Sequence, residues 1–242
     1  MDTAEQADQP GRDSRLSIIV PVLNEASAIG AALARLQPLR AIGHEVIVVD
    51  GGSRDRTAET ALPLADRVVA SPRGRASQMN VGARIATGDV LLFLHADTVL
   101  PVDAERRIRA GLLAGNHAWG RFDVRLSGNA MALRMVESCM NLRSRVTGIA
   151  TGDQAMFVYR ATFEKIGGFP AVALMEDVAL SARLKRETPP LCLRQSVVSS
   201  SRKWEREGVM RTILLMWRLR LAFFLGTDPS DLARRYYRCD RQ

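Results

Sequence analysis

The sequence predicts an α/β fold in which a mostly parallel β-sheet carries helices on both faces and continues into a C-terminal helical extension. Short apolar runs rich in β-branched residues alternate with segments whose apolar residues recur at helical spacing. This alternation is typical of parallel sheets, because a helix returns the chain to the edge where the next strand begins. Hydrophobic residues make up 47% of the 242 residues and charged residues 25%, the balance expected of an ordinary buried core.

The first hundred residues contain four strand-like runs joined by helices. The runs lie at residues 16–20, 46–49, 67–70 and 90–94, and the second is apolar on consecutive positions, as in a strand covered on both faces. The first helix opens at Asn24 and Glu25 and is expected to end at Pro38. Two more helices are expected at 56–64 and 76–86, which gives a β-α-β-α-β-α-β order.

The pattern changes beyond residue 118. Strand-like segments at 119–127 and 154–160 flank a long stretch rich in Met and Arg that carries no clear assignment. A helix at 176–186, a strand at 191–198 and a long helix at 209–225 follow, the last punctuated by Pro229. This half is expected to consist of α+β additions that bind substrate.

The sequence contains no internal repeat and no long linker, so it predicts one compact domain at 16–204. Residues 1–15 are polar and are expected to form a flexible lead-in without the apolar stretch of a secretory signal. Residues 205–242 form a basic helical extension. The segment 202–242 carries ten basic and five acidic residues, a surplus of five within the net charge of +8.

Composition also excludes several classes of protein. Three cysteines without a CxxC pair support neither a disulfide framework nor a zinc knuckle. Aromatic residues are only 5% of the chain and no nucleic-acid-binding motif is present, so no nucleic-acid partner is expected. The segment 209–225 is interrupted by three arginines and is too short to span a bilayer. We therefore expect a cytoplasmic protein, or one bound peripherally at the inner face of the membrane.

The three arginines of that segment lie on different sides of the expected helix. Arg211 and Arg218 are seven residues apart and share one face, whereas Arg220 lies nearly opposite. Such a helix could pack on the domain or on the second copy of a homodimer, or it could lie on an anionic membrane surface.

Polar residues follow each of the four strands of the first half. They are residues 21–25, 50–55, 71–75 and 95–97, and three of the four segments contain acids. The carboxyl ends of parallel strands meet at one edge of the sheet, where open α/β sheets bind their ligands. The sequence therefore predicts a binding cleft at this edge.

Asp50 ends the second strand and precedes two glycines that permit a tight turn. Its carboxylate could accept hydrogen bonds from a ribose or a base, or it could cap the helix that starts near Arg56. The chain has no GxGxxG after the first strand and no GxxxxGK[ST] segment. Dinucleotide-binding and P-loop folds are therefore disfavoured.

His95 and Asp97 follow the fourth strand two positions apart, so in extended backbone their side chains point to the same side. Asp97 and diphosphate oxygens would suit Mg²⁺ or Mn²⁺, whereas His95 is a tolerable ligand for Mn²⁺ and a poor one for Mg²⁺. The alternative is that Asp97 caps the helix after Pro101 and that His95 makes only hydrogen bonds.

Glu176 and Asp177 begin a helix after a glycine-rich loop. A helix N-terminus stabilises negative charge, so at least one of these carboxylates should stay ionised and could act as a general base. The alternative is an acidic first turn without a catalytic role.

Six segments in this order resemble the inverting family 2 glycosyltransferases, which have the nucleotide-diphospho-sugar (A-type) fold. The segments are IIVPVLNEA, VVDGGSRDRT, PRGRASQMNVGA, GDVLLFLHADT, GDQAMFVYR and IGGFPAVALMEDVALSARLK. The resemblance covers about 190 of the 242 residues, from Leu16 to Trp204. It is strongest to small bacterial members with HAD in place of DxD, a group labelled arsenosugar-biosynthesis-like glycosyltransferases.

The resemblance implies a nucleotide-binding half at 16–100 and an acceptor-binding half at 101–204. For the nucleotide and donor it implies Pro21, Asn24, Glu25, Asp50, Arg75 and Asp97. For the substrate pocket it implies Gly152, Asp153 and Trp204. Asp177 matches the catalytic base, with Glu176 in support. Asp97 matches the metal-binding acid, and His95 replaces the first acid of DxD, so the implied cofactor is Mg²⁺ or Mn²⁺.

The activity implied is transfer of a sugar from a nucleotide diphosphate, by resemblance UDP, to an acceptor hydroxyl with inversion. Two alternatives remain. A non-catalytic nucleotide-binding or scaffold protein of the same fold is suggested by His95 in the DxD position. A nucleotidyltransferase that makes sugar nucleotides would have a glycine-rich GxGTRxxP-like loop after the first strand, where this chain has VPVLNEAS.

Overall fold

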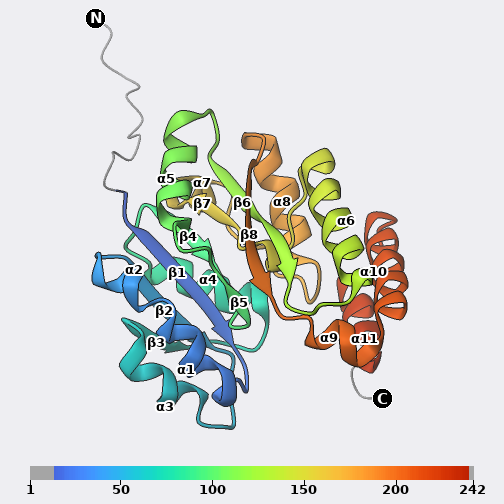
Figure 1. Ribbon diagram of the computed structural model, residues 1–242, viewed down its shortest axis with the longest axis horizontal. Helices are drawn as coiled ribbons and strands as arrows, with labels where there is room; N and C mark the ends of the chain where they lie inside the picture. Colours follow the sequence, from blue (N-terminus) through green and yellow to red (C-terminus); the bar gives the residue numbers. More distant parts are fainter. Residues whose placement is uncertain (1–13, 240–242) are drawn as a thin grey trace, which may run out of the picture.

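An eight-stranded sheet forms the centre of the computed structural model, which describes residues 14–239 (Figure 1). The strand order is β3-β2-β1-β4-β7-β6-β8-β5. The strands are β1 Leu16–Val22, β2 Glu45–Asp50, β3 Arg67–Ala70, β4 Val90–Phe93, β5 Thr98–Val99, β6 Trp119–Leu126, β7 Phe157–Tyr159 and β8 Leu191–Ser199. The predicted α/β fold is confirmed. The sheet is mixed, with four of the seven pairings in this part of the chain parallel.

The four strands β3, β2, β1 and β4 form the parallel half of the sheet. Their apolar residues alternate between two cores, so that Ile18 and Val20 of β1 face one side and Ile19 faces the other. All three side chains are buried, because helices cover both faces. This explains why the central runs 46–49 and 90–93 are apolar at every position rather than at every second one.

The helices divide between the two faces of the sheet (Figure 1). One face packs against α1 Ala26–Ala34, α3 Thr57–Ala61, α5 Ala104–Ala114 and α6 Met131–Thr147. The other face packs against α4 Arg75–Ile85, α7 Arg160–Lys165 and α8 Glu176–Glu187. The Met- and Arg-rich stretch without a sequence assignment is α6. It is amphipathic, with Leu133 and Val136 buried and Met131 and Met135 exposed.

Pro38 does not end the helical region as expected. The first helix stops at Ala34, and Pro38 lies in the first turn of a second short helix, α2 Gln37–Ala41. Proline is tolerated there because the first amides of a helix have no intrahelical acceptor. The predicted helix at 56–64 is likewise split, into α3 and a 3₁₀ turn η1 Leu62–Leu64.

The antiparallel strand β7 places a loop against the end of β4. Because β7 runs opposite to β4, the residues before it lie beside the carboxyl end of β4. These residues form the 3₁₀ turn η2 Gly152–Gln154. The backbone amide of Phe93 donates to the carbonyl of Met156 at 2.9 Å and continues this contact past the strands. The GDQ segment at 152–154 therefore lies beside the HAD segment at 95–97.

Three helices form the C-terminal extension: α9 Arg202–Glu207, α10 Val209–Phe224 and α11 Pro229–Cys239. Leu219 of α10 and Leu232 of α11 pack with Met175 and Val178 at the start of α8. The extension therefore covers the end of the sheet at which α8 begins (Figure 1). The predicted helix at 209–225 corresponds to α10, and α11 lies within the predicted helical extension, although no separate helix after Pro229 was assigned to it. Across residues 14–239, the helices lack the combination of length and apolar character that crossing a bilayer demands. The predicted lead-in at 1–15 lies almost wholly outside these residues.

Candidate functional site

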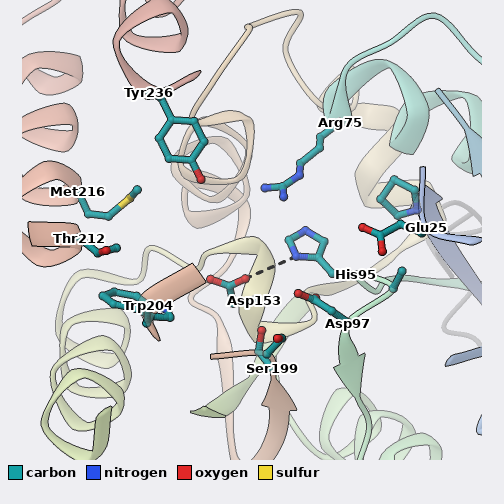
Figure 2. Close-up of a pocket in the computed structure, with 13 residues that line it drawn as sticks. Glu25, Arg75, His95, Asp97, Asp153, Ser199, Trp204, Thr212, Met216 and Tyr236 are labelled. Atoms are coloured by element: carbon teal, nitrogen blue, oxygen red, sulfur yellow. Dashed lines mark ion pairs between the residues drawn. The ribbon is translucent and has the colours of Figure 1, made fainter. Parts of the chain in front are cut away.

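Two adjoining cavities open at the carboxyl ends of β1 and β4. The smaller, of about 220 Å³, is drawn in Figure 2, and the larger has a volume of about 460 Å³. They share five lining residues: Glu25, Arg75, Asp153, Met216 and Tyr236. We refer to the two together as the cleft. Of the residues implied by the sequence, Pro21, His95, Asp97 and Trp204 also line the smaller cavity, and Glu176 and Asp177 line the larger.

Asn24 and Asp50 do not line either cavity but connect the loops that do. Asn24 has a positive φ of 55°. Its backbone amide donates to Ser53 Oγ at 2.8 Å, and its side-chain oxygen accepts from the amide of Arg54 at 2.8 Å. Asp50 accepts from both the amide and the hydroxyl of Ser53. The carboxylate is thus engaged in a local turn, but it does not cap the following helix, whose N-cap is Arg56 and which has no side-chain cap hydrogen bond.

Glu25 follows this turn and enters both cavities. Burial raises the pKa of its carboxyl, and the nearby charges of Asp97 and Asp55 raise it further, while Arg202 and Arg75 act in the opposite direction. The two carboxylates of Glu25 and Asp97 therefore make this end of the cleft a negative environment, which favours a bound cation.

Arg75 supplies a cation opposite these acids. It is the first residue of α4 and follows Gly74, whose φ of 137° suits glycine alone. Figure 2 shows its guanidinium directed into the cleft between Tyr236 and His95. Its charge lowers the pKa of Asp153 and counteracts the rise at Glu176.

His95 and Asp153 face each other across the smaller cavity (Figure 2). The Nδ1 atom of His95 lies 3.5 Å from Oδ1 of Asp153. Burial would raise the pKa of Asp153, but its hydrogen bond to His95 and the charges of His95, Arg75 and Arg220 hold the pKa below the ordinary value. A Cβ at Gly152 would lie 2.5 Å from Cε1 of the imidazole, so glycine is required for this approach.

Asp177 joins the start of α8 to the GDQ segment. Its Oδ2 accepts from the amide of Gly152 at 2.7 Å and its Oδ1 from the amide of Val178 at 2.7 Å. Ser181 Oγ donates to the Asp177 carbonyl at 2.8 Å and accepts from the amide of Ala150 at 3.1 Å. The carboxylate is therefore held in one orientation at the wall of the larger cavity.

Glu176 lies beside Asp177 but in a different environment. It is buried, and burial followed by the charge of Asp177 raises the pKa of its carboxyl, while Arg75 opposes the rise. The neighbouring carboxyls thus differ, because the neutral form is favoured at Glu176 and two backbone amides are directed at Asp177.

The side chains present fit a metal held by one protein carboxylate. Within residues 14–239, no cluster of three or more His, Cys, Asp or Glu side chains forms a ligand set for an ion. Mg²⁺ and Mn²⁺ commonly bind through one or two carboxylates together with substrate phosphates and water. Asp97, in the negative environment shared with Glu25, meets that requirement, whereas the ring of His95 is directed at Asp153.

Sequence reasoning did not identify several residues that line the cleft. They are Ser199 and Ser200 at the end of β8, Thr212, Met216 and Arg220 on α10, and Tyr236 on α11. For Arg220 a signal was present, since it is the arginine of α10 that lies opposite Arg211 and Arg218. The latter two are exposed, and Arg220 faces the cleft.

The sequence is similar to known glycosyltransferases. Residues 17–159 match the family model described as "Glycosyl transferase family 2". The chain is 36% identical over 108 residues to the PGL/p-HBAD biosynthesis glycosyltransferase of Mycobacterium bovis (strain BCG / Pasteur 1173P2), with 42% of each chain covered. It is 32% identical over 163 residues to undecaprenyl-phosphate 4-deoxy-4-formamido-L-arabinose transferase of Pseudomonas fluorescens (strain Pf0-1), which covers 61% of this chain and 47% of the relative. The alignments therefore span less than half the length of these relatives.

Two solved structures share the fold. A mannosyltransferase from Pyrobaculum calidifontis, in complex with GDP-Man and Mn²⁺, superimposes with a TM-score of 0.61 at 23% identity, covering 86% of this chain and 61% of that one. Glucosyl-3-phosphoglycerate synthase from Mycobacterium tuberculosis, in complex with Mn²⁺, UDP and glucosyl-3-phosphoglycerate, gives a TM-score of 0.57 at 17% identity, covering 77% and 71%. With the family model matching more than half of its residues, this chain belongs to glycosyl transferase family 2.

Proposed function

We propose that this enzyme transfers a sugar from a UDP-linked donor to an acceptor hydroxyl with inversion at the anomeric carbon. The observation that carries the proposal is that two acids eighty residues apart line one cleft. Asp97 lines the smaller cavity and Asp177 the larger, and Glu25, Arg75 and Asp153 line both. One acid is therefore available near a leaving diphosphate and another near an attacking hydroxyl.

Asp177 is proposed to act as the general base. A carboxylate has about four lone-pair positions. Two are used by the amides of Gly152 and Val178, which leaves acceptor capacity for a substrate hydroxyl. As the acceptor oxygen forms its bond to the anomeric carbon, its proton passes to Asp177. The bond from that carbon to the diphosphate breaks on the opposite face, and the nucleoside diphosphate leaves with the electron pair.

Glu176 is proposed to support this base without competing with it. The pKa of its carboxyl is raised, first by burial and then by the charge of Asp177. A raised pKa makes Glu176 easier to protonate than an ordinary glutamate, which would ease the repulsion between the two neighbouring carboxyl groups. Arg75, which faces both cavities, is proposed to contact the donor diphosphate.

Asp97 is proposed to hold Mg²⁺ or Mn²⁺ together with the diphosphate of the donor. The bound cation would offset the negative charge that develops on the leaving diphosphate. Support comes from the mannosyltransferase and synthase structures, whose complexes contain Mn²⁺ with GDP-Man and with UDP. The HAD segment at 95–97 also supports assignment to the subgroup labelled arsenosugar-biosynthesis-like glycosyltransferases.

A thermal-shift screen tests the proposal directly. The purified chain is heated with UDP, GDP, CDP or dTDP, each in the presence of Mn²⁺, Mg²⁺ or a chelator. A ligand at one hundred times its Kd stabilises the native state by about 2.7 kcal/mol, a rise in Tm of roughly 5–11 °C for a domain of this size. We expect UDP with a divalent cation to give the largest rise. Absence of a shift with every nucleotide would favour the scaffold alternative.

We also propose that α10 contacts an anionic membrane surface. Its exposed apolar side chains recur every three or four residues and are Met210, Leu214, Trp217, Leu221 and Phe224. Arg211 and Arg218 are exposed along one edge of this stripe. An apolar stripe bordered by arginines suits a helix lying in the headgroup region of anionic lipids.

Co-sedimentation with vesicles of phosphatidylglycerol and phosphatidylcholine tests this contact. A Trp217→Gln, Leu221→Gln double variant of the full chain is expected to bind at least tenfold more weakly, because each apolar side chain contributes about 1.5–3 kcal/mol when buried. Ile42→Gln removes an equally exposed apolar side chain at the end of α2 and serves as the control. Equal binding by all three proteins contradicts the proposal. A dimer that the double variant dissociates would instead assign the stripe to a homodimer interface.

A further inference from the structure

Two arginines on the Asp177 side of the cleft have buried nitrogens without a hydrogen-bond acceptor. Arg143 lies on α6 and Arg220 on α10, and the two helices pack against each other. Nε and Nη2 of Arg143 and Nε of Arg220 are buried and unpartnered among residues 14–239. Neither guanidinium forms an ion pair there. Other arginines with a buried Nε are different, since Arg121 and Arg134 each reach a carboxylate.

The two guanidiniums carry like positive charges that repel each other. Burial lowers the pKa of Arg143 to about 10, and the charge of Arg220 contributes, while Asp177 acts in the opposite direction. Burial also lowers the pKa of Arg220, against the charges of Asp177 and Asp153. Both guanidiniums remain protonated at neutral pH. Unsatisfied buried donors and two adjacent like charges destabilise the free protein, and a bound anion would relieve both effects.

The position of the pair indicates which substrate carries that anion. Arg220 lines the larger cavity with Asp177 and does not line the smaller cavity that contains Asp97. The charges that act on Arg143 are those of Arg220, Asp177 and Arg121, and Asp97 is not among them. Arg220 therefore stands beside the base, and Arg143, which lines neither cavity, lies on the helix packed against α10 with Asp177 among the charges that act on it.

We propose that Arg143 and Arg220 form a subsite for a phosphate group of the acceptor, next to the oxygen that attacks the sugar. The guanidinium fork donates two parallel hydrogen bonds to phosphate oxygens, and two such forks suit a tetrahedral dianion. The inference rests on the proposed function, because it names the acceptor class for the same cleft. The phosphate can belong to a soluble ester or to a lipid headgroup.

The test uses inorganic phosphate as the probe and Tm as the measurement, with and without saturating UDP and Mn²⁺. We expect phosphate to raise Tm in both conditions. In Arg143→Gln and in Arg220→Gln the phosphate concentration for half of the shift is expected to rise about tenfold or more, as when a charged hydrogen bond is lost. Arg84→Gln, an exposed arginine of α4 outside both cavities, is the matched control and keeps the shift of the unmodified chain.

The same measurements separate failure of this inference from failure of the proposed function. A UDP shift retained in both variants, with the phosphate shift lost, supports the acceptor subsite. A phosphate shift that disappears when UDP and Mn²⁺ are present assigns the arginines to the donor diphosphate and overturns it. Absence of any phosphate shift also overturns it, whereas absence of a UDP shift in the unmodified chain contradicts the proposed function instead.

Two further probes identify the source of the phosphate. Glycerol 3-phosphate represents a soluble ester, and phosphatidylcholine vesicles containing phosphatidic acid represent a lipid headgroup. Binding of one of them that weakens in Arg220→Gln but not in Arg84→Gln assigns the source. If inorganic phosphate binds but neither probe does, the subsite does not serve a phosphorylated acceptor.

Discussion

An Asp177→Asn variant is expected to lose about 10²- to 10⁴-fold in kcat while its nucleotide affinity changes little. The amide cannot accept the proton of the acceptor hydroxyl, and Asp177 lines only the larger cavity, whereas Asp97 lines only the smaller. The measurement is the release of nucleoside diphosphate from the donor that the thermal screen identifies, together with the Tm shift given by that nucleotide. Loss of the nucleotide shift with turnover retained would contradict the assignment.

The same substitution also perturbs the start of α8, and a control must separate this effect from catalysis. An asparagine offers one oxygen where Gly152 and Val178 require two acceptors, so an amide loses its partner at a cost of about 1–3 kcal/mol. Ser181→Ala removes the hydroxyl that binds Ala150 and the carbonyl of Asp177, with a similar expected cost. We expect both variants to melt earlier and only Asp177→Asn to lose turnover. Equal loss in Ser181→Ala would make the role structural.

Replacing Asp97 by asparagine is expected to lower kcat/KM by about 10²- to 10³-fold and to abolish the dependence of nucleotide binding on divalent cations. An amide is a weak ligand for Mg²⁺ or Mn²⁺, and the charge on the departing diphosphate would lose its counterion. The measurements are initial rates over a metal titration and the UDP shift with metal or chelator.

Asp103→Asn is the matched control for Asp97. It makes the same chemical change six residues later, at the N-cap of α5 and outside both cavities. We expect it to keep the rate and the metal dependence of the unmodified chain. If Asp97→Asn retains a metal-dependent UDP shift, the cation is held elsewhere and His95, Glu25 and Asp153 become the next residues to replace.

The parallel half of the fold could be predicted from the sequence because it is covered on both sides. Runs such as 46–49 are apolar at every position, and only a strand buried between two helical layers requires this. The stretch that forms α6 was harder to assign. Its exposed face carries Met131, Met135 and Leu142, so the apolar pattern that usually marks the buried side of a helix is present on both sides.

The candidate site could be predicted where its residues follow strands and not where they come from distant helices. Asp97 and Glu25 end up together because the carboxyl ends of β4 and β1 are adjacent in a parallel sheet. The contact between His95 and Asp153 depends on the antiparallel pairing of β7 with β4, which no local pattern specifies. Arg220 and Tyr236 reach the cleft through the packing of α10 and α11, and this is decided only by the tertiary structure.

The closing of the cleft by α10 and α11 has a consequence for the order in which the enzyme is made. The sheet ends at Ser199, and the carboxylates of Asp97 and Asp177 also lie before residue 200. Three other residues that line the cleft lie after it: Met216, Arg220 and Tyr236. Domains generally begin to fold from the N-terminus during synthesis. A nascent chain can therefore assemble its sheet while the cleft still lacks one wall. The enclosed site exists only when α10 and α11 have docked, so the cleft becomes complete later in synthesis than the sheet beneath it.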